Sequence, residues 1–385
     1  MKNALFFNGE QLKKARTYRG YTVGELADLT GYQRQTISMY ENGRSTPFDL
    51  SVILNFARVL DFPPRFFSEK SSCLKPSSTY FRALLTTNRK YRTQQEQKIE
   101  FVAELYGFIQ EYVDFPKTNL PDFPPDVTPD TAANILREYW GLGNRPISDL
   151  IYTVEENGII VTSFQTDTDA VDAFSKKIEI GDETRFFIGY SSNKTSAARI
   201  HFDVAHELGH ICLHGWTEDI DSLEKEEFKK REEQANRFAA AFLLPKDSFC
   251  NDVRYNPYSL PFYKSLKQKW KVSIAAMIRR AFSLDIIDSD HYQILIRTMQ
   301  RRSMWRNEPL DDVIITSEPS LLRTSVIMLL TEEIFTAKEF IDELSYNYGL
   351  SLNPHEIEYL LNLPEGTLKV NKALTSPKSI IRKDK

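Results

Sequence analysis

Hydrophobic positions along most of this chain recur with the three-to-four-residue period of amphipathic helices, and only short stretches favour strands. The pattern is clearest over 93–113, where Ile99, Val102, Leu105, Ile109 and Tyr112 share one face. Further helices are predicted over 11–19, 33–40, 130–142, 147–156, 197–213, 232–244, 272–283, 292–302, 321–334 and 340–349. Strands are predicted over 159–162 and 185–189. The pattern predicts a mostly helical α+β fold with a small sheet.

Breaks in the pattern divide the 385 residues into parts of domain size. A Ser-rich and basic stretch follows Phe67, and five prolines between 116 and 129 mark an irregular connection. The expected parts are 1–70, 71–130, 131–290 and 291–385. The long helix in the second part either mediates a homodimer or packs on the domain that follows, and we favour packing.

Bulk composition excludes some classes of protein. Hydrophobic residues make up 41% of the chain, enough for packed cores, but no apolar run approaches the ~18 residues of a membrane span. Residues 1–7 lack the apolar core of a signal peptide. The three cysteines are far apart, which fits free thiols in a reducing cytosol. We therefore expect a cytoplasmic protein that does not bind membranes.

Residues 11–40 follow the pattern of short helices joined by a tight turn. Thr22 and Glu25, three residues apart, predict a capping box at the start of one helix, and Gly31 supplies the turn after it. Ile37 would then pack inward from the next helix. This is the pattern of a helix-turn-helix, whose second helix enters the DNA major groove.

The same region resembles the Cro/repressor (XRE) family at Glu25-Leu26-Ala27, Thr30-Gly31, Thr36-Ile37-Ser38 and Tyr40-Glu41-Asn42-Gly43-Arg44. The resemblance implies that residues 1–70 bind double-stranded DNA. The side chains that point away from Ile37 are candidates for reading base edges: Gln33, Arg34, Gln35 and Ser38. Those better placed for phosphate are Asn42, Arg44 and Lys14. Ten Lys/Arg against seven Asp/Glu leave residues 1–70 only mildly basic, so a helical protein-interaction module is the alternative.

A second motif, His206-Glu207-Leu208-Gly209-His210, lies in an apolar, proline-free segment. On a helix, two histidines four residues apart project from one face and can hold one metal ion. Glu207 lies between them, where a carboxylate can take a proton from a water molecule. The motif predicts zinc-assisted hydrolysis, with a pair of hydrogen-bonded core histidines as the alternative.

A zinc hydrolase needs a third protein ligand and an open fourth position. The predicted helix that ends before Pro245 carries Glu232, which we favour as that ligand over its neighbour Glu233. Asn236 is one turn from Glu232 and would form a hydrogen bond that orients one of the metal ligands. His214 continues the face of His210 and is either a helix-end partner or a substitute ligand. For His201 we favour a structural role over that of a hydrogen-bond donor to the transition state.

The two segments together resemble the ImmA/IrrE family of bacterial metallopeptidases. The resemblance rests on His206-Glu207-x-x-His210, on the lead-in Arg199-x-x-Phe202, and on Glu232-x-x-Ala235-Asn236-x-Phe238-Ala239 followed by Leu243-Leu244-x-Pro245. It covers about residues 145–250. It implies a small zincin-like domain, Zn²⁺ as the metal, and regulatory cleavage of a repressor protein.

These observations predict a transcriptional regulator built from four parts. They are a helix-turn-helix domain (1–70), a linker with a long amphipathic helix (71–130), a zinc metallopeptidase domain (131–290) and a helical domain for sensing or assembly (291–385). The expected partners are operator DNA, a protein substrate such as a repressor, and a second copy of the chain. The alternative is a repressor whose peptidase-like domain senses a ligand or partner without cleaving.

Overall fold

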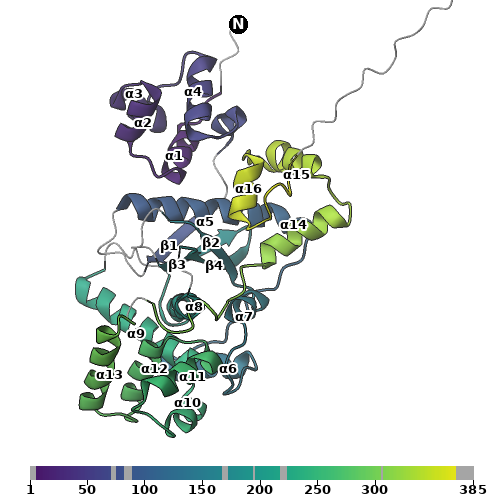
Figure 1. The fold of residues 1–385 in the computed structure, drawn as a ribbon. Coiled ribbons are helices and arrows are strands. Elements are labelled where there is room, and N and C mark those ends of the chain that lie inside the picture. The colour runs from purple at the N-terminus through teal and green to yellow at the C-terminus, as the bar shows by residue number, and fades with distance from the viewer. Residues whose placement is uncertain are drawn as a thin grey trace, which may run out of the picture.

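The computed structural model describes residues 6–70, 75–81, 89–166, 172–193, 196–216, 223–304 and 307–369. Within them the chain forms two hydrophobic cores, one on each face of a small sheet (Figure 1). Cys73 and the basic tail from Lys378 to Lys385 lie outside the described residues. The expected mostly helical α+β fold is confirmed.

The N-terminal unit is a set of short helices: α1 (Gly9–Tyr18), α2 (Val23–Thr30), α3 (Arg34–Glu41), α4 (Leu50–Leu60) and the 3₁₀ helix η1 (Pro64–Ser68). The expected capping box is present, because the Thr22 side chain accepts from the amide of Glu25 and the Glu25 side chain accepts from the amide of Thr22. Gly31 ends α2 at φ 78°, a conformation that favours glycine. Ile37 on α3 is fully buried, as its predicted inward position requires.

The sheet contains four described strands in the order β1-β3-β4-β2. They are β1 (Lys75–Phe81), β2 (Ile160–Phe164), β3 (Ala173–Ile180) and β4 (Glu183–Ser191). β3 is antiparallel to both β1 and β4, whereas β2 runs parallel to β4. The sequence pattern predicted β2 and β4 but not β1 or β3.

One face of the sheet is covered by α5 (Arg89–Ile109), which corresponds to the long helix expected at 93–113. Its residues from Gln97 to Ile109 are nearly all buried within this chain. Gly189 of β4 leaves room for α5, because a Cβ there would lie 3.3 Å from the Ile99 side chain and closer still to Phe174. The helix therefore has an intramolecular packing role, which leaves it little free surface for a second copy.

The other face carries the helices of the second core. They are α6 (Pro129–Tyr139), α7 (Leu150–Glu156), α8 (Ala197–Leu213), α9 (Lys225–Leu243), α10 (Lys246–Val253), α11 (Leu260–Trp270), α12 (Ile274–Ser283) and α13 (Ser289–Arg301). Thr128 caps α6 by accepting from the amide of Thr131, so Asp130, the first residue of the predicted helix, is not the cap. Asp130 instead forms ion pairs with Arg237 of α9 and Arg280 of α12, so it ties three helices together.

The C-terminal helices return to the first core. They are α14 (Leu321–Thr331), α15 (Ala337–Glu343), the π-helix η3 (Leu344–Tyr348) and α16 (Pro354–Leu360). The expected 291–385 part is thus divided in the structure, since α13 packs with the second core and α14 to α16 pack with the first. The domain boundaries expected from the sequence stay predictions.

The N-terminal unit is docked on α5 and α16. Tyr18 stacks edge-on against Phe101 of α5 at 5.2 Å between ring centroids and donates a hydrogen bond to Glu356 of α16. Lys14, expected at phosphate, lies 3.1 Å from the Glu104 carboxylate of α5. Figure 1 shows α1 facing α5 and α3 on the side of the unit turned away from it. The face of α3 is therefore left open.

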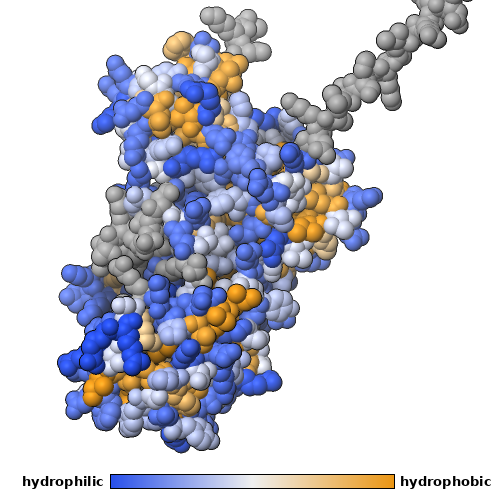
Figure 2. Space-filling view, in the orientation of Figure 1, coloured by the Kyte–Doolittle hydropathy of each residue, from blue (hydrophilic) through white to orange (hydrophobic). Residues whose placement is uncertain are grey.

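Two surface findings complete the fold. Among the described helices, none has the length and apolar character needed to cross a membrane. Figure 2 shows hydrophobic surface on the N-terminal unit, whose exposed apolar side chains include Phe48, Leu50 and Leu54 near the start of α4. The expected homodimer stays a prediction.

Candidate metal centre and nucleic-acid face

The metal motif lies in the middle of α8, which is buried between the sheet and α9. His206, Glu207 and His210 are each 0% exposed. Gly209 lets α9 approach closely, because a Cβ at this position would meet Ala235 of α9 at 3.2 Å. A glycine inside the motif thus brings the histidines within reach of the carboxylates on α9.

The three predicted ligands converge at one point between α8 and α9. The Nε2 atoms of His206 and His210 are 3.0 Å apart, and the Glu232 carboxylate oxygens lie 3.5 Å and 3.2 Å from them. One donor atom from each residue lies within 4.8 Å of the other two. Glu233, the alternative, has a largely exposed side chain 3.8 Å from the ammonium of Lys229. The geometry therefore favours Glu232 as the third ligand.

Asn236 fixes which nitrogen of His206 faces this point. The Asn236 amide oxygen lies 3.1 Å from His206 Nδ1. An amide oxygen can only accept a hydrogen bond, so Nδ1 carries the hydrogen and the Nε2 lone pair is left for a ligand bond. The contact is the one that the predicted supporting role of Asn236 requires, and the role itself stays a prediction.

His214 and Gln234 do the same for His210. Gln234 Oε1 lies 3.2 Å from His214 Nε2, so that nitrogen donates and His214 Nδ1 accepts. Burial, and then the neighbouring His210, lower the pKa of His214 to about 3, which keeps its ring neutral. His214 Nδ1 lies 2.9 Å from His210 Nδ1, which therefore donates and leaves the His210 Nε2 lone pair facing Glu232. The sequence left His214 open as a helix-end residue or a ligand; it caps α8 and orients His210.

These donors fit a zinc ion. Burial raises the pKa of Glu232, but the adjoining side chains of His206 and His210 outweigh burial and lower it to about 2, so the carboxylate is ionised. Two nitrogen lone pairs 3.0 Å apart beside an anion repel one another unless a cation lies among them. Two imidazoles and one carboxylate are a common catalytic ligand set for zinc. Glu207 is outside this set of donors.

Glu207 faces the sheet rather than α9. Its Oε2 accepts a hydrogen bond of 2.7 Å from the hydroxyl of Ser175 on β3. Ser175 is itself 0% exposed, so the contact is shielded from bulk water. Sequence reasoning missed Ser175 because it did not predict β3. The hydroxyl holds the carboxylate in place without neutralising it.

The remaining histidine of α8 is structural. His201 is buried, and burial lowers its pKa to about 4. Its Nε2 lies 2.9 Å from the hydroxyl of Thr316, in the segment that leads to α14. This contact ties α8 to the returning chain.

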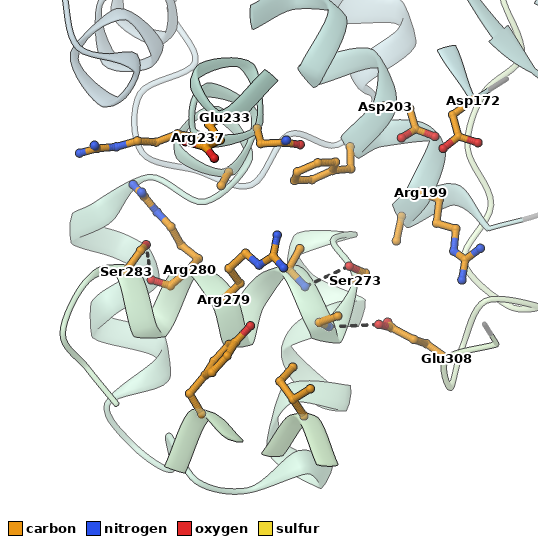
Figure 3. Close-up of a pocket in the computed structure, with 18 residues that line it drawn as sticks. Asp172, Arg199, Asp203, Glu233, Arg237, Ser273, Arg279, Arg280, Ser283 and Glu308 are labelled. Atoms are coloured by element: carbon orange, nitrogen blue, oxygen red, sulfur yellow. Dashed lines mark hydrogen bonds between the residues drawn. The ribbon is translucent and has the colours of Figure 1, made fainter. Parts of the chain in front are cut away.

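A cavity of about 730 Å³ adjoins the candidate metal site (Figure 3). It lies one helical turn beyond the ligands, since Phe202 precedes His206 by four residues and Asn236 follows Glu232 by four. Its lining combines apolar side chains, among them Phe202, Ala276 and Ile296, with charged ones that include Arg199, Arg237, Arg279 and Arg280. Figure 3 shows Arg279 of α12 pointing from one wall into the middle of the cavity, whose opposite wall carries Glu233 and Arg237 of α9. Its volume is that of a binding site for a small ligand or a few side chains.

The predicted base-reading residues lie on the outer face of α3. Gln33, Arg34 and Gln35 are exposed, and Ser38 is half-buried. The Arg34 guanidinium rests on Gly24 of α2, where a Cβ would lie 2.8 Å from its Cζ. An open groove between α2 and α3 is lined by Arg34, Gln35 and Ser38 together with Thr22, Glu25 and Asp28.

Asn42 and Arg44, both predicted to contact phosphate, follow the end of α3 and differ in how their side chains are engaged. The Asn42 amide donates to the carbonyl of Ser38 at 2.7 Å, so this donor is already used within α3. Arg44 is exposed. Glu25 of α2 is bound by Lys90 of α5 at 2.7 Å, a contact that offsets one acidic charge beside the groove.

Two protein-family models match this chain, one over the N-terminal unit and one over the region of the candidate metal site. Residues 9–65 match the model of a helix-turn-helix domain, and residues 154–282 match the IrrE N-terminal-like domain of peptidase family M78. The chain combines a DNA-binding helix-turn-helix domain with an IrrE-like domain. The match of the IrrE-like domain includes both helices that carry the candidate ligands.

Similar proteins are found for the helix-turn-helix domain. A putative HTH-type transcriptional regulatory protein of Thermococcus gammatolerans is 43% identical over 56 residues, which is 14% of this chain and 17% of that protein. The SPbeta prophage-derived uncharacterized HTH-type transcriptional regulator YonR of Bacillus subtilis is 40% identical over 52 residues, 14% of this chain and 47% of that protein. The similarity thus spans less than half the length of either relative.

Proposed function

We propose that this chain is a transcriptional regulator that binds DNA through its helix-turn-helix domain. We further propose that it hydrolyses a peptide bond of another protein at a metal site formed by His206, His210 and Glu232. The observation that carries the proposal is the convergence of three oriented donors beside a buried carboxylate that is not among them. Zinc held there would polarise a peptide carbonyl and a water molecule. We propose a repressor protein as the substrate.

The chain's own residues supply the rest of the chemistry. Asn236 and His214 hold the two imidazoles in the tautomers that the site needs. Glu207 would take the proton of the attacking water and pass it to the amine of the departing segment as the C–N bond breaks. Ser175 acts as a positioning residue for that carboxylate.

The competing function is a repressor whose IrrE-like domain senses a ligand or partner without cleaving it. The cavity beside the site is the observation that favours it. Expression from the regulated promoter in cells carrying Glu207→Gln separates the two. If promoter expression no longer responds to the inducing signal while the variant still binds zinc and DNA, hydrolysis is supported. An unchanged response supports a sensor.

For DNA recognition, we expect Arg34→Ala to weaken binding to a specific site by about 1–3 kcal/mol, because an Arg in the major groove pairs with guanine through two hydrogen bonds. Arg58→Ala is the matched control, since Arg58 is also exposed and is hydrogen-bonded on α4 rather than α3. Both variants lose one positive charge. Fluorescence anisotropy on a duplex selected from random sequences by the wild type measures the difference, and equal losses would contradict a base-reading role.

For substrate choice, we propose that the cavity receives apolar side chains of the cleaved segment. Replacing Ala276, one of its lining residues, by valine, leucine and tryptophan fills it stepwise. The expected result is a KM for peptide substrate that rises about ten-fold or more with side-chain volume, while zinc content stays constant. Steady-state kinetics on one substrate measure this. A KM unaffected by tryptophan would show that the substrate does not enter the cavity.

A further inference from the structure

The edge of β3 beside the metal helix is occupied by a segment of this chain. β1, from the connection between the helix-turn-helix domain and α5, pairs antiparallel with β3, and Figure 1 shows it beside that strand. The other side of β3 is taken by β4. Any other strand that added to β3 would therefore have to replace β1.

This edge is next to the candidate catalytic carboxylate. The register pairs Tyr80 of β1 with Ser175 of β3, and the Ser175 hydroxyl donates to Glu207 at 2.7 Å. A peptide that adds to a sheet edge is held by backbone hydrogen bonds, and such pairing suits recognition of an extended substrate. The backbone of β1 thus lies where a substrate strand would bring its peptide bonds toward Glu207.

The pairing of β1 has features of a strand that can be exchanged. Its register shifts between Pro76 and Thr79, so the ladder is interrupted. Pro76 has no amide hydrogen to donate. The sequence Lys-Pro-Ser-Ser-Thr-Tyr-Phe is mostly polar for a strand. A mostly polar strand with an interrupted ladder gains less from cross-strand side-chain pairs than a regular apolar strand does.

We propose that residues 75–81 are a tethered occupant of the substrate-binding edge and compete with peptide substrates for β3. The proposal rests on the proposed peptidase function, because it assigns the edge beside Glu207 to substrate. Tethering gives such a segment an effective concentration in the millimolar range. If the untethered segment bound β3 with a dissociation constant of about 0.1 mM, its tethered form would lower the apparent affinity of a competing peptide for β3 about ten-fold.

The test measures peptide binding to the full chain with Glu207→Gln, which prevents hydrolysis of the probe. The probe is a fluorescent synthetic peptide of residues 73–83, with a scrambled peptide as control. We compare the chain that keeps residues 75–81 with one in which they are replaced by seven Gly and Ser residues. We expect the replacement to bind the probe at least about ten-fold more tightly, measured by anisotropy. Equal affinities, or no binding to a folded, zinc-loaded replacement, would overturn the proposal.

A second variant and a second measurement guard against misfolding. Thr79→Pro removes one backbone donor without altering the length of the connection, and it should increase probe binding in the same direction. Hydrogen exchange of the β3 amides should be faster in both variants than in the parent chain, and the probe should slow it again. Unchanged exchange in both would contradict occupancy of the edge.

The outcome is separable from that of the proposed function. Zinc content and hydrolysis by the chain with Glu207 intact test the peptidase. Probe binding in the Glu207→Gln chains tests the edge. If the probe replaces β1 but no chain hydrolyses peptides, the competition for β3 is supported and the peptidase function is contradicted. If peptides are hydrolysed but the probe binds both chains equally, the peptidase function is supported and the competition is contradicted.

Discussion

Glu207→Gln is expected to lower the rate of peptide hydrolysis by about 10²- to 10⁴-fold, the range for loss of a general base. Glu207 is fully buried, and its Oε2 accepts from Ser175 at 2.7 Å. Glutamine has the same shape and its amide oxygen can accept the same hydrogen bond, but it cannot take a proton from water. Because the cluster of candidate ligands does not include Glu207, zinc content should be unchanged.

The measurement starts from an unknown substrate. Lysate incubated with the zinc-loaded wild type is searched by N-terminal labelling and mass spectrometry for new protein ends that the variant does not produce. Initial rates are then compared on a peptide spanning the identified bond. Glu226→Gln is the matched control, since it makes the same chemical change on an exposed side chain of α9 that is not among the residues lining the cavity. A Glu207→Gln chain that retains a tenth or more of the wild-type rate would exclude Glu207 as the base.

The sequence predicted the helices of the candidate metal centre well because its information there is local. Histidines four apart on one helix must share a face, and Glu232 and Asn236 repeat the spacing on the next helix. The pairing of Asn236 with His206 followed from that geometry. The role of His214 was left open, since choosing between ligand and support required knowing that Gln234 lies beside it.

The missed strand β3 shows why the rest was harder to predict. Its face toward α5 includes Lys176, a polar residue where the alternating pattern of a strand calls for an apolar one. Lys176 is buried because it pairs with Glu100 of α5 at 2.8 Å, a partner 76 residues away. Such a pair cannot be inferred from periodicity. Without β3, neither Ser175 nor the edge that β1 occupies could be found.

The docking of the helix-turn-helix domain was equally out of reach. Tyr18 and Glu356 are 338 residues apart in the chain. The outward face of α3 was predicted from the family resemblance, but the packing of this unit on α5 and α16 was not. The contact between Lys90 of α5 and Glu25 of α2 adds a direct link between the groove and the helix that covers the sheet.

Glu232→Ala is expected to abolish zinc binding, while Glu233→Ala leaves about one zinc per chain. The Glu232 carboxylate lies 3.2 Å from His210 Nε2 and 3.5 Å from His206 Nε2, whereas Glu233 faces Lys229 at the surface. Losing a residue that supports a ligand typically costs 10- to 100-fold in metal affinity, so losing a ligand itself should cost more than about 100-fold. Metal analysis of the purified chains and competition with a chelating dye measure both effects.

Asn236→Ala supplies the intermediate case, because its amide orients His206 without itself joining the cluster of donors. Its zinc affinity should fall between those of Glu233→Ala and Glu232→Ala. Zinc lost with Glu233→Ala and kept with Glu232→Ala would transfer the ligand role to Glu233.

Absence of metal from the wild type, even after zinc is supplied, would remove the basis for hydrolysis. The chain would then be better explained as a DNA-binding regulator whose IrrE-like domain is a sensor, with the cavity beside Asn236 as the place for its ligand.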